Sequence, residues 1–312
     1  MLARKTIHPF ALLVLFLLPG AGCLRSIALG AAANALAATG NSYSSDEDPE
    51  LIAAAAPFGL KTMEQVLAEK PEHVGLLTAL VSGFTAYAVV FVGQDADEMD
   101  EKDVERGKVL HLRARKLLLR ARGYGLRGLE VNHPGFIEAF KTGGPDSAPA
   151  RAKLLAAMTK DDVKLLYWTG ASWALAIASK KDDMKLVGEL PLVEELMTRA
   201  LQIDEGFDRG SIHEFFVAYD ASRDETAGGG PAKSKEHLDR ALALAKNEKL
   251  GVLVSFAESV CVGRQDKAEF TRLLTQVVSF DVDSAPNDRL PNLLAQRRAR
   301  WLLGRTADLF AE

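Results

Sequence analysis

Cysteine is scarce in this chain, and neither sign of charge is in strong excess. Only two cysteines occur among 312 residues, too few for a disulfide framework or a cysteine-based zinc module. The formal net charge is −4 at pH 7, which argues against a nucleic-acid binder, because such proteins normally show a basic surface. With 48% hydrophobic and 26% charged residues, the composition excludes a disordered tail and a polytopic membrane protein and predicts a folded, water-facing chain.

Motifs for catalysis and for metal or nucleotide binding are also missing. His213-Glu214 resembles the start of a zinc-protease helix, but that motif needs a second histidine where Val217 stands. The sequence has no Gly-x-x-x-x-Gly-Lys loop and no Gly-x-Ser-x-Gly turn. We therefore expect no catalytic residues, no metal site and no cofactor, and we expect that the protein is not an enzyme.

The N-terminus has the layout of a bacterial export signal. Arg4 and Lys5 precede an apolar run over 10–18, which is too short to span a bilayer because a spanning helix needs about twenty residues. Small residues at 20–22 then precede Cys23, as in the lipobox of bacterial lipoproteins, although Gly20 stands where leucine is usual. The pattern predicts a lipoprotein signal peptide over 1–22 and lipid attachment at Cys23, and no later segment is suited to spanning. The alternative is simple cleavage at a small-residue site that leaves Cys23 unmodified.

After Cys23, apolar residues recur at steps of three and four, a pattern typical of amphipathic helices. No segment shows the sustained alternation of half-buried strands. The sequence therefore predicts an all-α protein with helices near 24–38, 51–69, 73–93, 103–131, 150–158, 161–180, 190–203, 207–222, 231–246, 249–262, 266–280 and 289–310. We expect a lipid-anchored segment with a short helix over 23–45 and a single helical domain over 46–312.

Within that domain, five segments approximate the second helix of a tetratricopeptide repeat (TPR), which has a small, a large and a small residue at fixed spacing. The three positions are Gly59/Met63/Val66, Arg122/Leu126/Leu129, Val193/Met197/Ala200, Ser234/Leu238/Ala241 and Phe270/Leu274/Val277. Stacked helix pairs bury faces that a single pair leaves exposed. The pattern predicts a degenerate TPR solenoid capped by a C-terminal helix, with Ala200 at a helix contact and Ala245 nearer solvent. An irregular helical bundle is the alternative.

The capping helix carries Arg297, Arg298 and Arg300, which we expect to form a solvated or ion-paired face.

A group of aromatic and polar residues is the candidate ligand site. Tyr167, Trp168 and Trp173 lie on one predicted first helix, and first helices form the inner wall of a TPR superhelix. His213 and Arg223 belong to the next first helix and its exit, where they could orient the polar end of a ligand in an apolar cavity. The alternative is that the tryptophans are core residues and Arg223 is a surface charge.

Several longer segments together resemble the T component (TatT) family of bacterial lipoproteins, which is associated with tripartite ATP-independent periplasmic (TRAP) transporters. The resemblance runs from about Cys23 to the C-terminus. The segments that carry it are 46–51, 57–64, 123–136, 165–173, 190–195, 213–215 and 294–301.

The resemblance implies an all-helical fold with cryptic TPR motifs, a lipid anchor facing the periplasm, and association with the solute-binding (P) component of a TRAP system. It also implies an accessory binding module with a cavity for a small ligand, and it makes a homo-oligomer plausible. Leu24 after the lipid cysteine slightly favours the outer membrane. The alternative function is a TPR scaffold lipoprotein that binds peptides or proteins in envelope assembly.

Overall fold

The computed structural model describes residues 20–38, 43–141 and 143–311, and all regular structure in these ranges is helical. The predicted all-α class is confirmed. The α-helices are α2 (Gly20–Ala38), α3 (Pro49–Glu69), α4 (Val74–Tyr87), α5 (Gln94–Asp100), α6 (Val104–Asn132), α7 (Phe136–Ala139), α8 (Ala148–Ala157), α9 (Val163–Ala178), α10 (Met184–Val187), α11 (Leu190–Ile203), α12 (Ser211–Ala221), α13 (Pro231–Leu244), α14 (Gly251–Phe256), α15 (Lys267–Ser279), α16 (Arg289–Gly304) and α17 (Thr306–Leu309).

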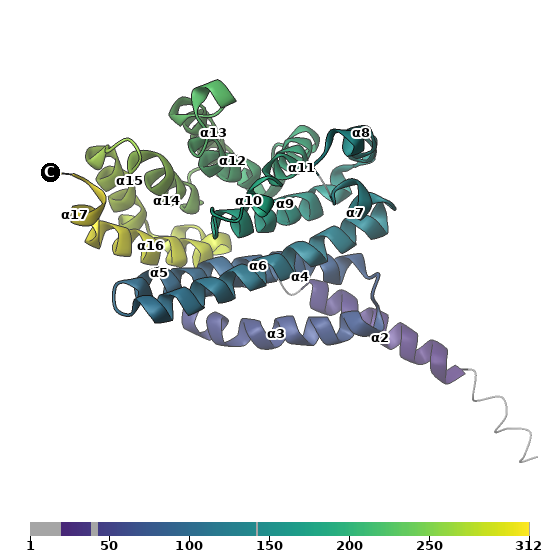
Figure 1. Ribbon diagram of the computed structural model, residues 1–312. Helices are drawn as coiled ribbons and strands as arrows, with labels where there is room; N and C mark the ends of the chain where they lie inside the picture. Colours follow the sequence, from purple (N-terminus) through teal and green to yellow (C-terminus); the bar gives the residue numbers. More distant parts are fainter. Residues whose placement is uncertain (1–19, 39–42, 142, 312) are drawn as a thin grey trace, which may run out of the picture.

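The predicted signal peptide lies almost entirely outside the described residues. Helix α2 begins at Gly20, so the backbone of Cys23 is part of it, whereas the Cys23 side chain is outside the description. Further along α2, Ala33 is fully buried and Asn34 lies 3.1 Å from His73 Nε2 at the start of α4. Helix α2 is thus docked on the body at one end, and its N-terminal part extends away from it (Figure 1).

Helix α4 continues through a π-helical turn, Ala88–Gly93, into α5. The sequence predicted an end near residue 93, so α5 is an addition. The combined helix Val74–Asp100 is long and apolar enough to cross a membrane by length and composition, which corrects the expectation that no later segment is. Leu76, Leu77 and Leu80 within it are fully buried in the main core, the arrangement of a core helix in a folded domain.

Helix α6 runs along α4 and α5 on one side and packs against α9 on the other (Figure 1). Glycines allow the close approach to α9. A Cβ atom on Gly125 would lie 2.2 Å from Thr169 Oγ1, and one on Gly128 would lie 2.8 Å from a Leu165 methyl carbon. These glycines fix the position of α9, which carries the predicted aromatic residues.

Two main hydrophobic cores meet at α12. Ile212, Phe216 and Tyr219 face the N-terminal core, which extends back to α2. Val217, on the other side of α12, faces the C-terminal core, which extends to Phe310. A small third cluster joins Ile52 of α3 to α16, so α16 also contacts the first part of the domain.

The positions singled out by the repeat pattern are mostly buried, including Met63, Met197, Ala200, Ala241 and Val277. The TPR register itself stays a prediction.

One expectation within that register is wrong. Ala245 is only 1% exposed, because α13 ends at Leu244 and the chain then reverses through Lys246 and Asn247, both at positive φ. A further correction concerns 207–222, predicted as one helix. Gly210 at φ 98° separates a short 3₁₀ turn from α12, since its left-handed conformation cannot continue a helix.

Candidate functional site

Tyr167 and Trp168 lie side by side in α9, and both are half-buried. Their ring centres are 5.1 Å apart in an edge-to-face arrangement. The Tyr167 ring centre is also 5.3 Å from that of Phe207, which lies just before α12. Burial, together with the negative charges of Glu214 and Asp208, raises the pKa of Tyr167, so the phenol stays protonated. These two aromatic residues thus lie where α9 meets the start of α12.

Trp173 lies deeper in α9 and is 2% exposed. Its Nε1 donates a hydrogen bond to Glu189 Oε2 at 2.8 Å, and the same oxygen accepts from Arg122 Nη1 at 2.8 Å. The Arg122 guanidinium also lies 5.0 Å from the Trp173 ring centre. With its polar atom satisfied and its ring covered, Trp173 is packed as a core residue.

His213 is buried on α12 and starts a chain of polar contacts. Its Nε2 lies 3.2 Å from Glu205 Oε1, and its Nδ1 lies 2.7 Å from Nδ1 of His237 on α13. His237 Nε2 in turn lies 3.4 Å from Asp220 Oδ2, and Asp220 is fully buried. Because two Nδ1 atoms at this distance can share only one proton, the histidine pair cannot be doubly charged without moving apart.

The pKa values of this histidine pair follow from burial. Burial lowers the pKa of His213, although its contact with Glu205 opposes the shift. Burial and then the charges of His213 and Lys233 lower the pKa of His237 to about 4. Both rings are therefore neutral near pH 7.

Arg223 follows the C-terminus of α12. Its Nη1 donates to Glu194 Oε1 of α11 at 2.9 Å, and its guanidinium lies 5.0 Å from the Tyr219 ring centre. Arg223 therefore connects α11 to the end of α12, whereas Tyr167 lies near its start. Since α12 rises about 1.5 Å per residue, these two candidates are at opposite ends of the helix. Whether any of the five predicted residues lines a ligand cavity stays a prediction.

A cavity of about 470 Å³ lies elsewhere, between the α5–α6 turn and the C-terminal helices. Acidic residues from α5 and arginines from the C-terminal helices dominate its wall. The lining residues are Asp97, Asp100, Glu101, Glu258, Arg298, Trp301, Leu302, Arg305 and Leu309.

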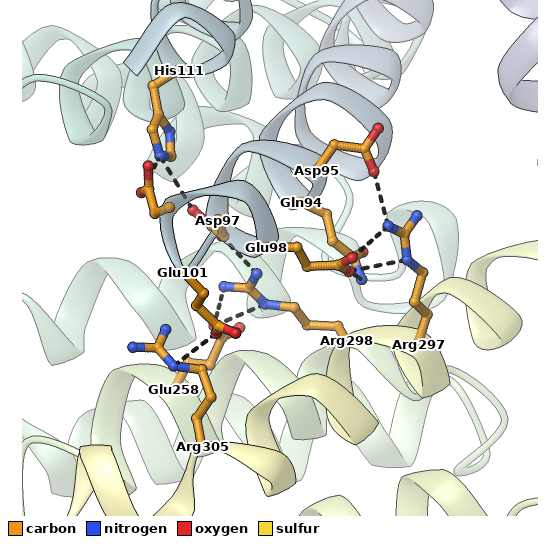
Figure 2. Close-up of polar contacts among 11 residues, drawn as sticks. Gln94, Asp95, Asp97, Glu98, Glu101, His111, Glu258, Arg297, Arg298 and Arg305 are labelled. Atoms are coloured by element: carbon orange, nitrogen blue, oxygen red, sulfur yellow. Dashed lines mark hydrogen bonds and ion pairs between the residues drawn. The ribbon is translucent and has the colours of Figure 1, made fainter. Parts of the chain in front are cut away.

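Arg298 is the centre of the polar network at this cavity, as Figure 2 shows. Its Nη1 donates to Asp97 Oδ2 at 2.6 Å, and its Nη2 donates to Glu258 Oε1 at 2.6 Å. Arg305 Nε lies 3.2 Å from Glu101 Oε1. Burial lowers the pKa of Arg298, but Glu258 and Asp97 more than compensate, and the pKa rises. The network fixes α16 to α5 by charge.

Trp301 lies between two guanidinium groups in the same wall. The guanidinium carbon of Arg298 is 4.3 Å from the ring centre, and that of Arg305 is 4.8 Å from it. Trp301 Nε1 is buried, and no hydrogen-bond partner for it lies in the described part of the chain. The wall of the cavity therefore consists largely of charged groups that are paired with one another, and the Trp301 N–H is covered.

The ion-paired alternative predicted for the arginines of the last helix is confirmed for Arg297 and Arg298. Arg297 Nη2 lies 2.8 Å from Asp95 Oδ1 and 3.0 Å from Glu98 Oε2. The partners on α5 were not predicted, because 94–100 was assigned to a connection rather than to a helix. Within the described ranges, no group of three or more His, Cys, Asp or Glu side chains is placed to hold a metal ion.

Comparisons with known proteins give a family match and one relative. A profile described as "TAtT: TRAP transporter T-component" matches residues 45–310. An uncharacterized protein of Treponema pallidum (strain Nichols) is 28% identical over 273 residues, which cover 86% of this chain and 83% of that protein. The family match spans all the helices from α3 to α17.

Proposed function

We propose, because the chain belongs to the TRAP transporter T-component family, that it is the lipid-anchored, periplasm-facing accessory subunit of a TRAP-type solute uptake system. Family membership makes it a TRAP transporter component of the cell envelope. The proposal adds that it binds the solute-binding P component and acts as a binding module without enzymatic activity. The observation that carries it is the family match over 45–310.

The anchor is supported by the N-terminal sequence and by the geometry of α2. The apolar run over 10–18 leads to the small residues before Cys23, and α2 extends from the body toward that end (Figure 1). Acyl chains on Cys23 would hold the protein to a bilayer, since each buried CH₂ contributes about 0.8 kcal/mol. The outer membrane is the favoured location because Leu24 follows the lipid cysteine.

The anchor is tested by comparing wild type with Cys23→Ala in detergent phase partitioning. We expect wild type in the detergent phase and the variant in the aqueous phase. Equal partition of both proteins into the detergent phase would show that Cys23 is not the anchor.

For the binding role, the helical architecture provides the surface. Two cores joined through α12 form an extended helical body (Figure 1). TPR-type stacking gives such a body a concave wall for a partner or ligand. Tyr167, Trp168, His213 and Arg223 remain our candidates for a ligand cavity, whereas the packing of Trp173 is that of the core alternative. Self-association into a homo-oligomer is part of the same proposal.

A further inference from the structure

Four arginines recur at intervals of seven residues along α6. They are Arg106, Arg113, Arg120 and Arg127. Seven residues are nearly two helical turns, so side chains at this spacing follow one face with only a slow drift. All four arginines are exposed, as are Val109, Leu112 and Lys116 between them. We call these seven residues the arginine stripe; it is about 30 Å long, since 21 residues separate its ends.

The arginine stripe lies on the most basic helix of an acidic protein. Helix α6 contains eight arginine or lysine residues and two glutamates, a net charge of +6, whereas the whole chain has a net charge of −4. Three α6 arginines are ion-paired within the fold: Arg115 with Asp183, Arg122 with Glu189 and, within the stripe, Arg120 with Glu64 at 3.1 Å. For Arg106, Arg113, Lys116 and Arg127, no carboxylate lies within 4 Å among the described residues.

Three of the arginines are held in place by aromatic rings. The guanidinium of Arg113 lies 5.8 Å from the Tyr87 ring, that of Arg120 lies 5.4 Å from Phe84, and that of Arg127 lies 5.8 Å from Tyr124. Arg127 also donates to Pro71 O at 3.0 Å. Contacts of this kind restrict the side chains before a partner arrives, which lowers the entropic cost of binding.

We propose that the arginine stripe is the docking surface for an acidic face of the solute-binding P component. The inference rests on the proposed function and adds the surface and its chemistry. Planar guanidinium groups pair with carboxylates through two parallel hydrogen bonds. Exposed Val109 and Leu112, at 64% and 51%, provide the apolar contact that protein interfaces combine with arginine. The length of the stripe suits a standard interface of about 800 Å² per partner.

A protein partner explains the stripe better than a lipid surface does. Membrane-binding helices direct large aromatic side chains outward into the bilayer, whereas the rings here lie beneath the arginines, and Phe84 is only 4% exposed. The anchor also lies at a distance, because Cys23 is ten residues, or about 15 Å, along α2 from the docked Ala33. The body can therefore lie at a distance from the membrane, with the arginine stripe accessible to a periplasmic protein.

The test measures binding between the full-length protein in detergent and a purified TRAP-type P component from the same organism, by biolayer interferometry from low to high salt. The stripe variant combines Arg113→Glu with Lys116→Glu. The control variant combines Lys153→Glu with Lys164→Glu, which are exposed on α8 and α9 and change the net charge equally. Arg106→Glu serves as a second stripe variant, and thermal melting checks that each protein is folded.

We expect the stripe variants to weaken binding about tenfold or more, the control to leave it nearly unchanged, and salt to weaken wild type more than the stripe variants. Equal binding by wild type, stripe and control variants would overturn the docking surface while leaving the proposed function intact. No binding by wild type would contradict both the proposed function and the assigned partner. Stripe-dependent binding to phosphatidylglycerol vesicles without any to the P component would make the membrane the occupant and overturn the proposal.

Discussion

At the scale of single residues, the two tryptophans of α9 differ in burial and in their contacts. Trp173 is buried and hydrogen-bonded to Glu189, whereas Trp168 is half-buried beside Tyr167. The five-residue spacing of the tryptophans predicted different sides of the helix, but it could not tell which one faced the core. That choice depends on α6, whose Arg122 and close-packed glycines cover one side of α9.

Trp173→Ala should lower the free energy of unfolding by about 3–5 kcal/mol, since it leaves a cavity and an unpaired Glu189 contact. Trp168→Ala should cost clearly less and, if Trp168 lines a ligand cavity, should weaken retention of a co-purified ligand. Urea unfolding of the two variants checks the difference. A larger loss for Trp168→Ala would assign it to the core and remove it from the candidate site.

The histidine pair predicts a dependence of stability on pH. His237 has a pKa of about 4 in the folded protein and about 6.5 when unfolded, so the unfolded chain binds more protons between these values. The stability that depends on neutral His237 is therefore fully present above pH 6.5 and is lost as pH falls toward 4. Between pH 7 and pH 5 the loss amounts to about 2 kcal/mol.

In His237→Phe this contribution is absent, so its free energy of unfolding should fall less than that of wild type over the same pH range. Asp220, whose pKa burial raises, is present in both proteins, and the comparison isolates the imidazole. Parallel pH profiles from urea unfolding would mean that His237 titrates normally in the folded state.

At the scale of helices, periodicity predicted most element positions, and the misses have identifiable causes. Residues 94–100 contain four acidic residues and were predicted as a connection. In the structure they continue the helix, because Arg297 and Arg298 of α16 form ion pairs with them. Such a partner about 200 positions away has no local signature. His213 was singled out because it lies on a predicted first helix, but its contact with His237 was not predicted, because the two rings meet only when α12 and α13 pack.

Ala200→Leu should destabilise the fold by about 1–3 kcal/mol. Ala200 is fully buried at a helix contact, and a larger side chain there would strain the packing. Ala243→Leu is the matched control, since Ala243 is exposed on α13. Ala245→Leu should resemble Ala200→Leu, given that Ala245 is buried. Thermal melting ranks the three variants, and a neutral Ala200→Leu would contradict the proposed repeat register.

Arg298→Met should cost about 2–3 kcal/mol, because it leaves Asp97 and Glu258 facing each other without a cation at a partly buried site. Arg300→Met on the same helix is the control, since Arg300 is exposed. Chemical denaturation in urea measures both losses. Equal stability of the two variants would show that the network in Figure 2 does not hold α16 against α5.

At the scale of the whole molecule, the sequence predicted the all-α class, which the structure confirms, and the family, which the family match confirms. It did not predict the contact of α16 with α3 and α5, nor the cavity beside it, because both depend on how two cores are placed around α12. The arginine stripe is visible in the sequence as a spacing of seven, yet its exposure depends on which face of α6 the rest of the chain leaves free.

The central claim is that this chain is a TRAP-system subunit that binds the P component, and co-purification from native membranes tests it most directly. Full-length protein with a C-terminal tag is solubilised in mild detergent, and the co-purified proteins are quantified by mass spectrometry against an unrelated tagged lipoprotein. We expect a TRAP-type P component to be the most enriched protein. Recovery of envelope-assembly proteins without any P component would contradict the claim and support the scaffold alternative.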